Sequence, residues 1–173
     1  MKRSLYDIAD DSGFLALIDP ASYLSFVDVD WTLDQLVRHF KEEMKNKRLV
    51  IWGTGREGNW RVEFRFSSSS DTGFREFNTL LWASDEHLLL TNYESLTMAA
   101  QFEDVQLPEA HQRDFLIPLA SSLYQCRIVQ RFDPELLDPL PQDNKADFLI
   151  ELIPAKNTAK AVGEFTGIPW TEF

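Results

Sequence analysis

The spacing of apolar residues along the chain first predicts a helix. Five apolar residues recur with helical spacing after residue 32: Leu33, Leu36, Val37, Phe40 and Met44. Positions i, i+3, i+4, i+7 and i+11 share one face of an α-helix. Thr32 and Gln35 have the spacing of a capping box, which satisfies backbone donors at a helix start. We therefore predict a helix over residues 32–47.

After this helix the apolar pattern changes to a period of two. Trp60, Val62, Phe64 and Phe66 alternate with charged residues, which predicts a strand with one buried and one wet face. Residues 95–102 are expected to form one or two helical turns. Shorter apolar runs predict a strand or a buried helical turn at residues 14–18, and strands at 23–27, 49–52, 77–83, 88–91, 115–119, 124–130 and 148–153.

These elements predict the class of fold. We expect a single α+β domain over residues 1–173, in which a largely antiparallel sheet of about six strands packs against one principal helix at 32–47. A chain of 173 residues is long enough for one domain with a sizeable core. With 44% apolar and 13% aromatic residues, the composition argues against intrinsic disorder.

The formal net charge of −11 narrows the choice of partner. It disfavours nucleic acid and anionic membrane surfaces, which would be repelled. Residues 85–114 contain seven acids and one arginine, and residues 133–151 contain six acids and one lysine. Localised acidic surfaces steer basic proteins. The candidate binding residues are Asp85, Glu86, Glu103, Asp104, Asp133, Glu135 and Asp138.

Cysteine content and hydropathy bear on the compartment. Cys126 is the single cysteine, so an internal disulfide is excluded. No apolar run approaches the length of about 20 residues that spans a bilayer, and the N-terminal residues do not resemble a signal peptide. We expect a cytoplasmic protein. Cys126 alternates in phase with Tyr124 and Ile128, which predicts a packed and unreactive thiol.

Residues 53–58, Gly-Thr-Gly-Arg-Glu-Gly, match the G-x-G-x-x-G pattern of phosphate-binding loops. Such a loop must be followed by a helix, because the first turn of that helix binds the pyrophosphate. Here a period-two segment follows, and no Lys-Ser or Lys-Thr pair follows Gly58. We therefore interpret the glycines as a hairpin tip that requires positive φ.

Residues 26–33, Phe-Val-Asp-Val-Asp-Trp-Thr-Leu, resemble the first motif of the haloacid-dehalogenase-like phosphatases. The resemblance implies Asp28 as nucleophile, Asp30 as general acid/base, bound Mg²⁺, and Thr54 as a phosphate ligand. It covers residues 23–56 and departs afterwards, where the family has a helix and this chain has a strand pattern. The same acids also suit a helix start, where negative charge is stabilising.

Other site chemistries find little support in the sequence. His39, His87 and His111 are far apart and have no zinc-ligand spacing. Counting from Asp28, the EF-hand positions for Gly and Glu hold Leu33 and His39. No G-x-S-x-G motif is present. We predict no cofactor and no metal.

Three functions fit these observations. The preferred one is a non-catalytic, acidic, protein-binding domain that masks a basic partner. Bacterial immunity proteins are similar in size and charge. The second is the Mg²⁺-dependent phosphatase that uses Asp28 and Asp30. The third is a small-ligand module with a pocket lined by Trp and Phe; tryptophans beside acidic loops also suit a protein-binding surface.

Overall fold

The computed structural model describes residues 3–136, 145–156 and 166–173. The described strands are β1 (Arg3–Asp10), β2 (Phe14–Ile18), β3 (Leu49–Gly53), β4 (Gly58–Arg65), β5 (Arg75–Ala83), β6 (His87–Asn92), β7 (Leu116–Pro118), β8 (Ser122–Gln130) and β9 (Phe148–Pro154). The helices are α1 (Leu33–Lys45), α2 (Tyr93–Gln101) and the 3-10 helix η1 (Ala110–Phe115). None of these helices is long and apolar enough to cross a membrane.

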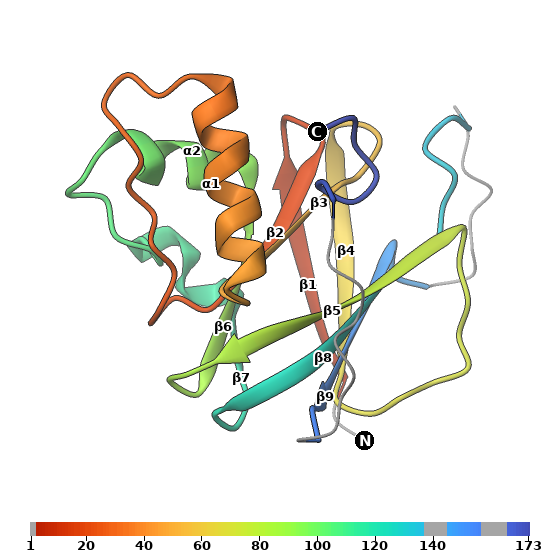
Figure 1. Ribbon diagram of the computed structural model, residues 1–173. Coiled ribbons are helices and arrows are strands. Elements are labelled where there is room, and N and C mark those ends of the chain that lie inside the picture. Colours follow the sequence, from red (N-terminus) through yellow and green to blue (C-terminus); the bar gives the residue numbers. More distant parts are fainter. Residues whose placement is uncertain (1–2, 137–144, 157–165) are drawn as a thin grey trace.

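Two sheets and a helical layer build the fold (Figure 1). Sheet A has the strand order β1-β4-β9-β8-β5, and sheet B has the order β3-β2-β6-β7. The β4–β9 pair is parallel, and the other strand pairs are antiparallel. The helices α1 and α2 lie on the side of sheet B that faces away from sheet A.

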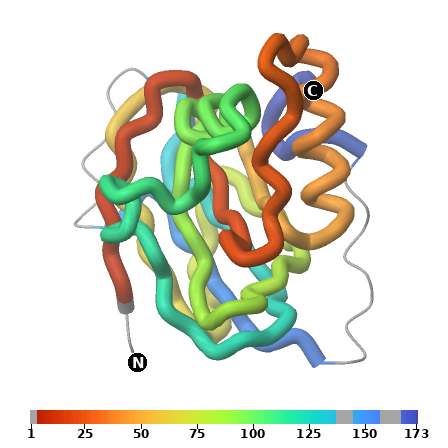
Figure 2. The backbone as a smooth tube through the Cα atoms, turned by 90° about the vertical axis from the view of Figure 1, so that its left-hand side faces the viewer, coloured from red at the N-terminus to blue at the C-terminus, as the bar shows by residue number. Residues whose placement is uncertain are grey.

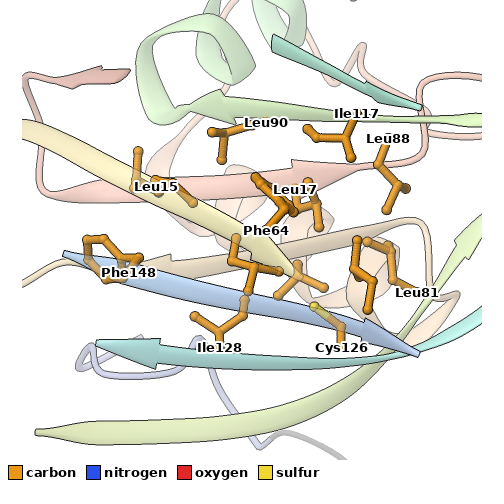
Figure 3. Packing of buried hydrophobic residues seen from close by; sticks show 14 of the residues in the cluster. Leu15, Leu17, Phe64, Leu81, Leu88, Leu90, Ile117, Cys126, Ile128 and Phe148 are labelled. Atoms are coloured by element: carbon orange, nitrogen blue, oxygen red, sulfur yellow. The ribbon is translucent and has the colours of Figure 1, made fainter. Parts of the chain in front are cut away.

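The main core lies between the two sheets (Figure 3). Because side chains alternate across a strand, Leu15 and Leu17 of β2 point towards sheet A, while Phe64 and Phe148 of that sheet point back at them. Cys126 is fully buried here without a disulfide, and burial raises the pKa of its thiol to about 12. The packed thiol predicted from its phase is therefore confirmed.

A second core fills the space between sheet B and the helices. Ala16 and Ile18 of β2 face it, and α1 contributes Leu36, Phe40 and Met44. The helix begins after Thr32, whose side chain accepts a hydrogen bond from the Gln35 backbone, as the capping box predicts.

The α+β class and the largely antiparallel pairing are confirmed, but the number of strands is not. Nine described strands form two sheets, where about six in one sheet were expected. Strand β1 was missed because its exposed face carries the apolar Leu5 and Ala9 and its buried face ends in Asp10, which obscures the alternation. Residues 23–27 were wrongly expected to be a strand: their backbone pairs with no strand, and Val27 N–H donates to the Ala100 carbonyl at 2.8 Å.

Candidate functional site

Residues 19–32, here called the strap, cross the helical layer between β2 and α1. Figure 2 shows the strap running between α2 and α1. The N–H groups of Val27 and Asp28 both donate to the Ala100 carbonyl of α2, at 2.8 and 3.2 Å. On the other side, Leu24 N–H donates to Glu43 Oε2 of α1 at 3.2 Å. These bonds fix the strap beside both helices.

Burial shifts the pKa values of three titratable groups at the contact of the strap with α1, in each case towards the neutral form. The rings of Tyr23 and His39 lie 5.9 Å apart between centroids. Burial, followed by the nearby Glu43 charge, raises the pKa of Tyr23. Burial lowers the pKa of His39 and raises the pKa of Glu43. Such pKa shifts are expected for titratable groups that are buried between the strap and α1.

The outer side of the strap exposes large apolar side chains. Leu24 and Val29 are each 60% exposed, and Phe26 is 39% exposed. Met98 and Phe102, at the end of α2, are 50% and 40% exposed. The hydrogen bonds to Ala100 place these two segments side by side. Exposed apolar groups gathered in one place are typical of interaction sites, whereas scattered ones are ordinary.

Exposed acids are neighbours of these apolar side chains along the strap and directly after α2. Asp28 and Asp30 are exposed on the strap, and Glu103 and Asp104 are exposed directly after α2. Residues 20–34 and 93–112 together contain seven acids and no lysine or arginine. We call Leu24, Phe26, Asp28, Val29, Asp30, Met98, Phe102, Glu103 and Asp104 the strap surface. Apolar anchors within a charged rim can bind a protein of opposite charge.

The remaining predicted binding residues lie elsewhere. Asp85 and Glu86 are exposed in the turn between β5 and β6, at the lower left of Figure 1. Asp133 and Glu135 follow β8 on the right, opposite the loop after α2. Asp138 lies outside the described residues. The acids that the sequence grouped by window therefore occupy separate regions of the surface.

The two aspartates of the phosphatase resemblance lie on the strap, before the N-cap residue Thr32 of α1. Asp28 Oδ1 accepts a hydrogen bond from the Asp30 backbone at 2.9 Å. The Thr54 hydroxyl is buried and lies 2.9 Å from Asp10 Oδ2. The parallel doubly wound sheet of that family is not formed by the described residues, and no three of their His, Cys, Asp or Glu side chains are arranged to hold a metal.

The glycine pattern forms a turn between the two sheets. The hairpin prediction was wrong, because β3 pairs with β2 while β4 pairs with β1 and β9. Gly55 has φ of +91°, and a Cβ there would lie 2.4 Å from Pro134. A Cβ on Gly53 would lie 2.8 Å from the Trp170 carbonyl oxygen. Positive φ and close packing explain these two glycines without a nucleotide.

Sequence reasoning missed a network of buried charges on the outer face of sheet A. Glu63 and Arg65 were expected on the wet face of β4, yet they are only 6% and 8% exposed. Asp71, in the loop between β4 and β5, binds Arg65 at 2.8 Å and Arg131 at 3.1 Å. A run of serines such as 67–70 is typical of a loop, but nothing in the sequence placed that loop over charged side chains.

Comparison with known proteins identifies solved structures of the same fold. No family model and no curated protein matches the chain. The solved structure "Crocagin biosynthetic gene J" is similar with a TM-score of 0.60 and 15% identity, over 90% of this chain and 100% of that chain. ComJ from Bacillus subtilis, described as an inhibitor of the DNA-degrading activity of NucA, has a TM-score of 0.52 and 9% identity, over 88% and 96% of the two chains. At these identities the likeness shows a shared fold.

Proposed function

We propose that this chain is a non-catalytic, acidic protein-binding domain that masks a basic surface of a protein partner, as an immunity protein does. The observation that carries the proposal is the strap surface, where five exposed apolar side chains share one region with four exposed acids. Aromatic anchors supply most of the binding energy of protein interfaces, and charges supply steering and specificity.

The neighbour ComJ supports the same kind of partner. It is described as inhibiting a DNA-degrading enzyme. An enzyme that holds DNA needs basic groups against the phosphates, and an acidic protein can cover such a face. We propose a partner of this type for the present chain, and we propose that it acts as a single domain in the cytoplasm without binding nucleic acid or membranes.

The acids outside the strap surface have a different part in the proposal. Asp85, Glu86, Asp133 and Glu135 add to the negative field of a chain with net charge −11. Such a field accelerates encounter with a basic protein over distances comparable to the Debye length, about 8 Å at physiological salt. We expect their removal to slow association and leave dissociation nearly unchanged.

The test begins with affinity capture of the partner from cells of the source, followed by calorimetry and kinetics with the purified partner. We expect a partner with a basic face, and an association rate that falls as salt rises. Phe26→Ala and Phe102→Ala should each weaken binding by about tenfold or more. Phe74→Ala is the matched control, because Phe74 is 51% exposed beside β5, away from the strap.

Two outcomes would overturn the proposal. One is a partner whose association rate does not depend on salt and whose affinity is unchanged by Phe26→Ala and Phe102→Ala. The other is equal weakening by Phe74→Ala, which would place the interface on another face. Melting temperatures close to that of the wild type would show that each variant is folded.

A further inference from the structure

An apolar pocket of about 210 Å³ opens between the first turns of α1 and α2. Its lining includes Val37 and Phe40 of α1, Ile51 of β3, Tyr93 of α2 and Phe173. None of the strap-surface residues lines it. A pocket for a drug-sized molecule or cofactor has a volume of about 300–1,000 Å³. This pocket is smaller, and its size suits one large side chain.

A carboxylate that is hydrogen-bonded to the pocket lining has one oxygen without a partner among the described residues. Ser12 lines the pocket, and its hydroxyl donates to Oε1 of Glu94. The other oxygen, Oε2, is buried and accepts no hydrogen bond from any described residue. Buried polar atoms are nearly always satisfied, and leaving one unsatisfied is costly. The position therefore favours a donor supplied from outside, and a cationic donor would bind most strongly.

The charges around the pocket favour the same occupant. Asp11 is exposed and lines the open hollow that adjoins the pocket at Ser12 and Phe14. The basic residue of that hollow, Arg56, is occupied over the rings of Trp60 and Phe132, at 5.7 and 5.6 Å from their centroids. Asp11 and Glu57 give that hollow two acids against one arginine, so a cation approaching Glu94 meets a net negative charge.

We propose that the pocket receives one large apolar side chain of the protein partner, and that Glu94 binds the lysine or arginine next to it. The inference rests on the proposed function, since it assigns the side chain to the partner. It adds a second anchor, separate from the strap surface, and it specifies a short apolar-basic segment in the partner.

Short peptides test the pocket without the partner. The probes are acetyl-Phe-Arg-amide, acetyl-Phe-Glu-amide and acetyl-Gly-Arg-amide, and the readout is the methyl NMR signals of Val37 and Ile51. We expect saturable shifts with acetyl-Phe-Arg-amide in the millimolar range, about −4 kcal/mol at a Kd of 1 mM. The other two peptides should bind about tenfold more weakly, because each lacks one of the two contacts.

Two variants complete the test. Glu94→Gln should weaken acetyl-Phe-Arg-amide about tenfold and leave acetyl-Phe-Glu-amide unchanged or stronger. Val37→Trp, which fills the pocket, should abolish the shifts, and Phe102→Ala should not affect them.

The absence of saturable shifts at about 20 mM peptide, or equal binding of all three peptides, would overturn the pocket proposal. If the peptides bind as expected but neither Glu94→Gln nor Val37→Trp weakens binding of the partner, the assignment of the pocket to the partner would be overturned. Because the peptide assay needs no partner, its result is independent of the strap-surface test.

Discussion

Replacing Glu63 by glutamine should destabilise the protein strongly, although β4 looks amphipathic in the sequence. Glu63 is 6% exposed and accepts hydrogen bonds from Arg65 Nε at 2.8 Å, Arg65 Nη2 at 3.3 Å and Arg131 Nη1 at 3.2 Å. Both arginines are less than 10% exposed. The Glu63→Gln change keeps the shape of the side chain and removes the charge that faces two buried cations.

The size of the expected loss in stability depends on which ion-pair partners Arg65 and Arg131 retain. Breaking a buried ion pair by removing one partner costs about 3–5 kcal/mol. Arg65 and Arg131 both retain Asp71, at 2.8 and 3.1 Å. We therefore expect the lower end, about 3 kcal/mol, which is a large part of a typical stability of about 5–15 kcal/mol. For a chain of this size the melting temperature should fall by about 6–12 °C.

Urea unfolding followed by tryptophan fluorescence and circular dichroism measures this loss. Asp7→Asn is the control, because Asp7 pairs with Arg61 at 3.0 Å while their side chains are 71% and 55% exposed. Exposed pairs contribute little, so the control should unfold like the wild type. A loss in Glu63→Gln below about 1 kcal/mol, or an equal loss in the control, would refute the reasoning.

Three further predictions concern acidification, the glycine turn and the thiol. Burial opposes ionisation of Glu63, but hydrogen bonds from its arginine partners outweigh it and lower the pKa, and a hydrogen bond from an arginine lowers the pKa of Asp71. A depressed pKa contributes its full stabilisation above the ordinary values of 4.5 and 3.8. This stabilisation should be lost as the pH falls through the depressed values. Urea midpoints measured between pH 7 and 2 should therefore fall with pH, and they should fall less in Glu63→Gln than in the wild type. Gly55→Ala should cost about 2 kcal/mol or more in urea unfolding, because it combines φ of +91° with a contact at 2.4 Å from Pro134; an unchanged stability would contradict the strain expected at this turn. Cys126, with a pKa of about 12 and no exposed surface, should react with iodoacetamide only as fast as the protein unfolds, and rapid labelling in native buffer would disprove its burial.

Several local features were predictable because neighbouring residues decide them. A helix satisfies its backbone within four residues, so apolar spacing and the Thr32 cap were enough to place α1 at Leu33–Lys45, within two residues of the prediction. The alternation of Trp60, Val62 and Phe64 likewise predicted the strand β4 and the face that it buries.

The candidate site was predicted only in part. Glu103 and Asp104 were identified from their charge and lie on the strap surface. Their apolar neighbours were not identified, because Phe26 and Met98 are 72 positions apart in the sequence and meet only through the bonds of Val27 and Asp28 to Ala100. Those bonds join segments that are distant in the sequence, and the folded helical layer brings them together.

The sequence by itself determined the α+β class, the position of α1 and the acidic character of the surface, because these depend on composition and on spacing between near neighbours. The tertiary structure decided which strands pair, that they divide into two sheets, and which charged residues become buried. A strand needs hydrogen-bond partners from distant parts of the chain. Glu63 became a buried charge because Asp71 and Arg131 were brought to it by the folding of other segments.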